Sequence, residues 1–147
     1  NTHTPGVIRN MIRVVREGAD VVIASRYRSG SYIRGVPLHR KFLSLVARFL
    51  FQLVFPTPGI RDYTCGYRAY RAPVLAEAFR HYGDDFVNQE GFQCMVDILI
   101  KLRRMDLIFR EVPLILRYDL KEGASKMKVA RTVGRTLALI ARRRLGR

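Results

Sequence analysis

The sequence is poor in several residue types, and each shortage excludes a class of protein. It has no tryptophan, two cysteines and three histidines among 147 residues. Cys65 and Cys94 have no second cysteine nearby, so a disulfide scaffold and a zinc site are excluded, and both are expected to be buried free thiols. The chain has only 11 glycines and 6 prolines, which excludes collagen-like and low-complexity proteins. With 48% hydrophobic residues it is expected to be one globular domain.

Acidic residues are also scarce, at 12 against 27 lysines and arginines. None occurs between Val21 and Arg61 or from Gly123 to the end, and both stretches are rich in arginine. The net charge of +15 predicts an anionic partner. Nucleic-acid-binding proteins usually combine basic residues with exposed aromatic ones or carry a known motif, and we find no such signature. We therefore expect no nucleic-acid partner and favour a phosphorylated, apolar ligand.

The hydrophobic pattern alternates between helices and strands, which predicts an α/β protein. The continuously apolar run 20–24 is typical of a strand buried on both faces of a parallel sheet. The segments 25–37 and 61–68 have no apolar period and are expected to be loops, and the length of the first favours a functional role. Helices are expected over 5–17, 39–55, 73–82, 91–104 and 127–145, and a second strand region, bent near Pro113, over 106–118.

Two of these helices have amphipathic or apolar surfaces that point to a membrane. Segment 39–55 is apolar around nearly its whole circumference, which indicates either deep burial or contact with lipid, but it is too short to span a bilayer. Segment 127–145 has a basic face opposite an apolar face, which suits the surface of an anionic membrane as well as it suits an ordinary packed helix. Its basic face consists of Lys128, Arg131, Arg135 and Arg142.

Five short segments, in this order and spacing, resemble the catalytic domain of polyprenyl-phosphate sugar transferases. The resemblance extends from His3 to Met127 and is strongest to the dolichyl-phosphate mannosyltransferase type within family 2 of the glycosyltransferases. The segments are Asp20-Val21-Val22-Ile23-Ala24-Ser25-Arg26-Tyr27, Pro37-Leu38-His39-Arg40, Asp62-Tyr63-Thr64-Cys65-Gly66-Tyr67-Arg68-Ala69-Tyr70, Glu111-Val112-Pro113 and Gly123-Ala124-Ser125-Lys126-Met127.

This resemblance implies that residues 1–147 form the acceptor side of one glycosyltransferase domain. The implied fold is a partial A-type glycosyltransferase fold, which is Rossmann-like, without its first nucleotide-binding strands. The implied reaction transfers a hexose, mannose first, from GDP-mannose or UDP-glucose to polyprenyl or dolichyl phosphate with inversion. The implied location is the cytoplasmic face of a membrane, with the chain bound peripherally or through segments outside it.

The family's metal site is expected outside this sequence. His3-Thr4-Pro5 stands where the family has His-Pro-Pro, so the two aspartates of its Asp-X-Asp motif are expected just before Asn1. Thr2 replaces a Gln that helps to hold the metal in some members. Because Mg²⁺ and Mn²⁺ need several oxygen ligands, we expect no metal site in this chain and no activity of the chain alone.

The resemblance also implies roles for individual side chains. Arg26 and Arg40 match the catalytic arginines that bind the acceptor phosphate, and Ser44 matches a hydroxyl beside them. A phosphate acceptor is already an anion, so it needs positioning by a planar guanidinium fork rather than a general base. Further contacts to the donor or to a closing loop are implied for Asp62, Arg68, Arg117 and Lys126, although for Asp62 a turn cap or a pairing with arginine is an equal alternative.

Two other functions stay open from the sequence alone. One is a family 2 glycosyltransferase that acts on a different acceptor, which would need neither Arg26 and Arg40 nor a membrane-facing helix. The other is a basic module that binds anionic lipid or nucleic acid without catalysis. The residues that precede Asn1 would discriminate between enzyme and module.

Overall fold

The structure is a computed structural model that describes residues 4–89, 91, 93–120 and the single positions 134, 138 and 141. The predicted helix 127–145 and Lys126 therefore lie outside the described residues, apart from those three positions. The helices are α1 (Gly6–Arg16), α2 (Leu38–Val54), α3 (Ala72–Tyr82) and α4 (Gln93–Leu102), with short 3-10 helices η1 (Gly83–Val87) and η2 (Tyr118–Leu120). The strands are β1 (Val21–Ser25), β2 (Tyr32–Arg34), β3 (Arg68–Tyr70), β4 (Phe109–Pro113) and β5 (Ile115–Arg117).

Strand β1 is the centre of a three-stranded sheet with the order β3-β1-β4. All five of its residues are buried, as the apolar run predicts. It pairs in parallel with β4, where Ile23 lies opposite Glu111, and antiparallel with β3. The expected parallel pairing is found with β4, whereas β3 makes the sheet mixed, because the chain returns from the loop that precedes Arg68 in the opposite direction along β1. The mixed α/β class is confirmed.

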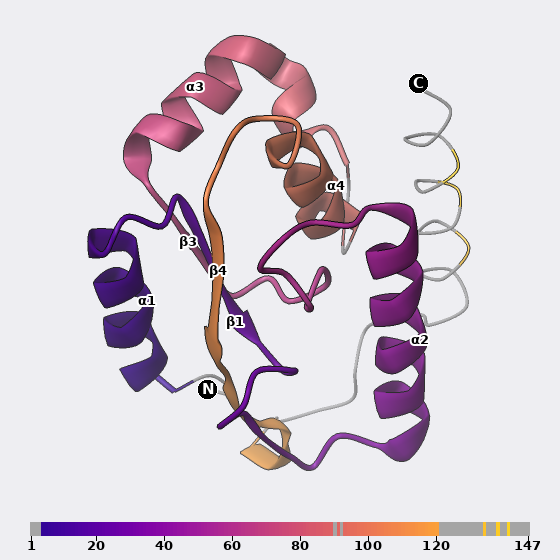
Figure 1. The fold of residues 1–147 in the computed structure, drawn as a ribbon. Coiled ribbons are helices and arrows are strands. Elements are labelled where there is room, and N and C mark those ends of the chain that lie inside the picture. Colours follow the sequence, from indigo (N-terminus) through magenta and orange to yellow (C-terminus); the bar gives the residue numbers. More distant parts are fainter. Residues whose placement is uncertain are drawn as a thin grey trace.

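The helices surround this sheet on different sides (Figure 1). Helix α1 packs beside the sheet through Val7 and Met11, and α2 lies on the other side, across the loop that joins it to β3. Helices α3 and α4 cover one end, and α4 is buried along most of its length. The core is thus formed by the sheet, one face of α1 and of α3, most of α4, the loop that precedes β3, and only the inner edge of α2.

Two predicted loops contain short strands that the pattern did not reveal. Strand β2 lies within 25–37 and pairs in parallel with β5, and β3 begins at the end of 61–68. A three-residue strand leaves no measurable alternation in the sequence, and its existence depends on a distant partner. The predicted bend of segment 106–118 is confirmed, since β4 ends at Pro113 and β5 begins two residues later.

Helix α2 is the element whose burial differs most from a normal globular helix. Among its described side chains only Phe51 is buried. Six large apolar side chains are exposed: Leu38, Phe42, Leu45, Val46, Phe49 and Leu53. We call this the outer face of α2. Of the two outcomes predicted for this segment, deep burial is therefore wrong. Within the described part of the chain, no helix combines the length and hydropathy that a membrane span requires.

Candidate functional site

The first residue after β1 is bound to the loop that precedes β3. Arg26 donates from Nε to Oδ2 of Asp62 at 2.8 Å and from Nη2 to Oδ1 at 2.7 Å. Its backbone N–H also donates to Asp62 Oδ2, at 3.0 Å. The Asp62 side chain is completely buried, whereas that of Arg26 is 20% exposed. The strand end and the loop are therefore joined by a two-point ion pair at the edge of the core.

Asp62 also organises its own loop. It accepts hydrogen bonds from the backbone N–H groups of Thr64 at 3.3 Å and Cys65 at 3.1 Å. Burial by itself would raise the pKa of the Asp62 carboxyl, but the hydrogen bonds and charge of Arg26 hold that pKa below its ordinary value. Asp62 is thus ionised and performs both structural roles expected as alternatives to substrate contact, the turn cap and the pairing with an arginine.

The contacts of Arg26 leave little of its guanidinium available. An arginine has five side-chain N–H groups. Three of them, on Nε and Nη2, go to Asp62 and to the Thr64 hydroxyl, and one on Nη1 goes to Ser44 Oγ at 3.2 Å. One N–H on Nη1 remains, so the forked edge of Arg26 is held by Asp62 and an anion would meet a single donor.

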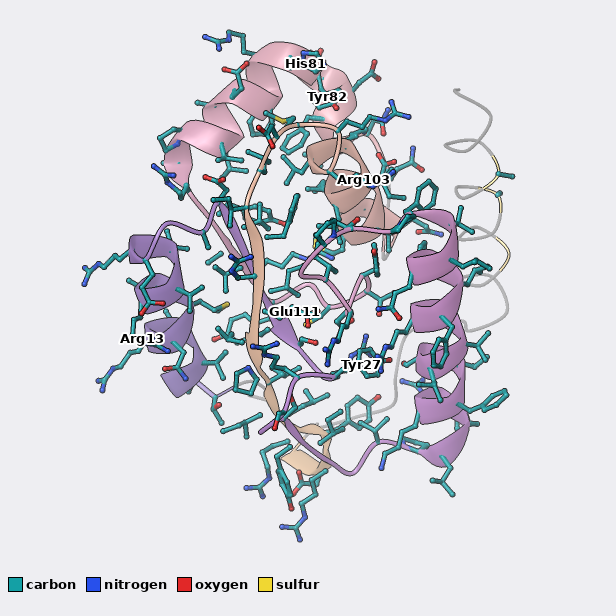
Figure 2. All side chains as sticks on the ribbon, viewed as in Figure 1. Arg13, Tyr27, His81, Tyr82, Arg103 and Glu111 are labelled. Carbon is teal, nitrogen blue, oxygen red and sulfur yellow. The ribbon has the colours of Figure 1, made fainter. Side chains whose placement is uncertain are left out.

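Tyr27 joins this cluster to α2. Its hydroxyl donates to the backbone carbonyl of Ser44 at 2.8 Å, and burial raises the pKa of the phenol. The guanidinium of Arg48 lies 4.6 Å from the centre of the Tyr27 ring, and that of Arg26 lies 5.5 Å from it. Figure 2 shows Tyr27 between the end of β1 and α2. The ring therefore fixes one side of α2 against the residues that follow β1.

Arg40 lies one helical turn before Ser44, so the two side chains project from the same face of α2. Its Nη1 donates to the Tyr118 hydroxyl at 2.8 Å, and the guanidinium lies 5.9 Å from the centre of the Tyr118 ring. The structure thus brings Arg26, Ser44 and Asp62 into one hydrogen-bonded cluster and places Arg40 on the adjoining turn, held by η2. Their roles toward a phosphate stay predictions.

A second buried carboxylate supports the same loop. Glu111, on β4, accepts the backbone N–H groups of Arg61 at 2.7 Å and Asp62 at 2.8 Å on one oxygen, Oε1. Burial raises the pKa of Glu111, while those two N–H groups and the Ser25 hydroxyl act in the opposite direction. Figure 2 shows it at the centre of the molecule. In the sequence, Glu111 was recognised only as part of the segment Glu111-Val112-Pro113 and not as a site residue. A charged residue in a strand that enters the core is itself a signal of a specific partner.

Gly59 allows the loop to approach β4 this closely. It has a φ of +82°, and a Cβ at this position would lie 2.5 Å from the carbonyl oxygen of Phe109. A side chain there would be strained and would push the loop away from the strand. The residues that follow in the loop, Arg61 and Asp62, could then no longer reach Glu111.

The other predicted site residues that the structure describes, Arg68 and Arg117, are not part of the cluster around Arg26. Arg68 donates to the carbonyl oxygens of Cys65 at 2.7 Å, Tyr63 at 2.8 Å and Met95 at 2.6 Å, so it closes the loop onto α4. Arg117 binds Asp119 at 2.9 Å. The structure does not bring either arginine into contact with Arg26 or Arg40, and Lys126 lies outside the described residues. Their donor or loop roles stay predictions.

The predictions for the two thiols are tested by the structure, whereas the prediction for the metal is not. Cys65 is a buried free thiol, as predicted, whereas Cys94, the second residue of α4, is only half-buried. In residues 4–89, 91 and 93–120 no group of three or more histidines, cysteines and acids is arranged to hold a metal ion. The requirement for Mg²⁺ or Mn²⁺ stays a prediction.

Comparison with known proteins gives relatives for most of the chain. No family model matches it. It is 31% identical over 126 residues to a polyprenol monophosphomannose synthase of Mycolicibacterium smegmatis and 32% identical over 126 residues to an undecaprenyl-phosphate mannosyltransferase of Micrococcus luteus. It is 30% identical over 127 residues to a dolichol-phosphate mannosyltransferase of Pyrococcus furiosus. Each match covers 86% of this chain but only 45%, 49% and 33% of these relatives respectively.

Proposed function

We propose that this chain, a partial member of the polyprenyl-phosphate mannosyltransferase family of glycosyltransferases, provides the acceptor side of an enzyme that glycosylates polyprenyl phosphate. The transferred sugar is a hexose, with mannose favoured by the names of all three relatives. The donor is a nucleotide sugar, GDP-mannose or UDP-glucose. The chain spans half or less of the length of the curated relatives, so the activity belongs to a longer enzyme that includes an A-type, Rossmann-like nucleotide-binding part.

The observation that carries the proposal is the two-sided character of α2. Ser44 contacts the Arg26–Asp62 cluster and Arg40 lies one turn earlier on the same side of α2, while the outer face of α2 exposes six large apolar side chains. A lipid phosphate needs this combination, because its head is an anion and its chain is apolar. Polyprenyl phosphate at a membrane surface would present its head to the inner side of α2 while the outer face enters the lipid.

The chemistry requires positioning more than proton transfer. A phosphate oxygen of the acceptor attacks the anomeric carbon, the new C–O bond forms, and the bond from that carbon to the nucleotide diphosphate breaks with inversion. The acceptor phosphate is already ionised at neutral pH, so cationic N–H donors suffice to align the oxygen and offset repulsion from the donor. A divalent ion, Mg²⁺ or Mn²⁺, would be held by aspartates of the complete enzyme that lie outside this chain.

The same arrangement supports attachment to the cytoplasmic face of a membrane. Phe42 and Phe49 on the outer face of α2 are 66% and 59% exposed, which is unusual for phenylalanine. The net charge of +15 adds electrostatic attraction to anionic lipid. Peripheral binding through α2 explains why an apolar face can be exposed without requiring a membrane-spanning segment in the described residues.

The test separates acceptor binding from donor binding in the complete enzyme, which contains this chain and its nucleotide-binding part. Arg40→Ala should lower kcat/KM for polyprenyl phosphate by one to three powers of ten, at about 1.4 kcal/mol for each power. GDP-mannose affinity should stay nearly unchanged, and Arg40→Lys should restore only part of the activity because lysine lacks the fork.

The control for that experiment is Arg13→Ala, which removes one positive charge from the exposed surface of α1. This variant should keep the kcat/KM for polyprenyl phosphate and the affinity for GDP-mannose of the unmodified enzyme. The 147-residue chain alone should transfer no sugar. Loss of GDP-mannose binding in Arg40→Ala, or unchanged acceptor kinetics, would contradict the acceptor assignment and favour a glycosyltransferase with another acceptor.

A further inference from the structure

The Arg26–Asp62 pair supplies almost no net charge to an anion. Asp62 is buried and ionised against Arg26, and only one N–H of that guanidinium remains. A phosphate monoester near neutral pH carries between one and two negative charges and three acceptor oxygens. Arg40 offers one guanidinium, so the proposed site has no more than one free positive charge for a ligand that carries between one and two negative charges.

Arg48 is the next cation on the same side of α2. Positions 40, 44 and 48 follow one another at intervals of four residues, so they form a strip along the helix with a rise of about 6 Å per step. Arg48 is half-buried. Within the described residues it makes no ion pair, and its one side-chain hydrogen bond there runs from Nε to Gln52 Oε1 at 3.4 Å. In the described part of the chain, the four N–H groups on Nη1 and Nη2 of Arg48 therefore donate no hydrogen bond.

The stacking of Arg48 holds these groups in place. Its guanidinium lies 4.6 Å from the centre of the Tyr27 ring, and the Tyr27 hydroxyl is bonded to the Ser44 carbonyl. A guanidinium over an aromatic face uses its π surface, which leaves its N–H edge directed outward for other acceptors. Arg48 is thus fixed beside Ser44 through Tyr27, and the entropy cost of ordering it is met before any ligand binds.

We propose that Arg48 is a phosphate-binding residue of this site, which with Arg40 and Ser44 holds the phosphate head of the polyprenyl phosphate acceptor. This rests on the proposed function, and it shifts the free positive charge of the site from Arg26 to α2. Arg26, neutralised by Asp62, then acts through its remaining N–H and through Ser44. The forked edge of Arg26 is bound to Asp62, so Arg48 provides the forked edge that binds the phosphate.

The same phosphate chemistry occurs in the head groups of anionic membrane lipids, so the experiment must separate the two sources. The complete enzyme is assayed in neutral detergent, without phospholipid, with farnesyl phosphate as the acceptor probe. Arg48→Met keeps an apolar stem over Tyr27 but removes the charge, and Arg48→Lys keeps the charge but removes the fork. The matched control is Arg103→Met, because Arg103 also lies over an aromatic ring, at 5.7 Å from the centre of Phe55.

We expect Arg48→Met to raise KM for farnesyl phosphate about tenfold or more, with a smaller change in kcat and unchanged GDP-mannose affinity. Arg48→Lys should recover part of this loss, and Arg103→Met should behave as the unmodified enzyme. The ³¹P resonance of farnesyl phosphate should broaden on titration with unmodified protein and much less with Arg48→Met. Thermal unfolding of each variant confirms that it is folded.

Two results would overturn the proposal. One is an unchanged KM in Arg48→Met while the unmodified enzyme is active. The other is a loss of binding to vesicles of phosphatidylglycerol, relative to phosphatidylcholine, with normal kinetics in detergent, which would make Arg48 a head-group contact. If the unmodified enzyme transferred no sugar to farnesyl phosphate or a longer polyprenyl phosphate, the proposed function itself would fail, and this outcome is distinct from both.

Discussion

The loop that precedes β3 and the outer face of α2 invert the usual distribution of polar and apolar groups. In the loop, charged Asp62 is completely buried, and its supporting residue Glu111 is 9% exposed. On α2, Leu38 and Leu53 are each 81% exposed. The loop has satisfied its polar groups within the protein, whereas the outer face of α2 leaves apolar surface in water.

This difference shows in which of the two regions the unusual groups have partners among the described residues. Buried charges persist only with close hydrogen-bond partners, and the Asp62 carboxylate accepts six hydrogen bonds, from Arg26 and from its own loop. A large exposed apolar face on a soluble surface is costly and marks an interaction site. The buried loop therefore fixes geometry, and the outer face of α2 is the surface that we propose to contact lipid.

The largest expected effect comes from breaking the loop. Asp62→Asn leaves the buried edge of Arg26 without a compensating charge and should lower the free energy of unfolding by about 3 kcal/mol. Urea denaturation of the full chain measures this. The control is Glu17→Gln, since Arg13–Glu17 has the same N–O separation of 2.7 Å but is exposed on both sides. We expect that change to stay within about 0.5 kcal/mol, and equal effects of the two would refute the comparison.

A smaller effect is expected from the outer face of α2. Phe42→Ser combined with Phe49→Ser should weaken binding to phosphatidylglycerol vesicles about tenfold, because each phenyl ring no longer enters the lipid, and should leave unfolding nearly unchanged. Sedimentation with vesicles at several salt concentrations measures it. Phe51→Ser is the contrasting variant, since Phe51 is buried and stacks on Tyr63 at 5.6 Å. It should destabilise the protein, and undiminished vesicle binding by the double variant would argue against membrane contact.

The smallest expected effect is on the pH dependence of stability, because the pKa shifts of the two buried acids, Asp62 and Glu111, have opposite signs. The folded pKa of Asp62 is below its ordinary 3.8, so its contribution to stability is present above pH 3.8 and is lost as pH falls through the folded value. The folded pKa of Glu111 is above its ordinary 4.5, so protonation of this group contributes stability below pH 4.5 that is lost as pH rises through the folded value.

Urea denaturation between pH 3 and 7 tests these signs. As pH falls toward 4.5, the unmodified protein should gain stability relative to Glu111→Gln, and below pH 3.8 it should lose stability relative to Asp62→Asn. Parallel pH curves for the unmodified protein and Glu111→Gln would show that burial of Glu111 does not shift its proton affinity.

Much of this arrangement could be predicted from local sequence. Helix α2, the buried strand β1 and the bend after Pro113 follow from periodicity, because each is long or apolar enough to leave a pattern. The structure places Ser44 Oγ 3.2 Å from Nη1 of Arg26, and the role of both residues toward a phosphate stays a prediction. The pairing of Arg26 with Asp62 was one of two alternatives for that aspartate.

Other features depend on distant partners and leave no local trace. The role of Glu111 requires the loop to lie across β4, and the donors it binds are 49 and 50 positions away in the sequence. Strands β2 and β3 exist only through their pairing with β5 and β1. The reduced availability of Arg26 could not be read from its residue type, since an arginine appears to offer a fork until its neighbours are known.

The parallel pairing of β1 with β4 also has a consequence for how the protein folds. Ile108 donates its N–H to Asp20, 88 positions earlier, at the point where this pairing begins. Closing so large a loop is entropically costly, and chains dominated by such contacts fold slowly. The cluster around Arg26 requires that closure to be complete, because Glu111 lies on β4 and Arg26 follows β1. The site should thus be among the last parts to form during refolding, later than α1 or α3, and a misfolded chain with normal helix content would still lack it.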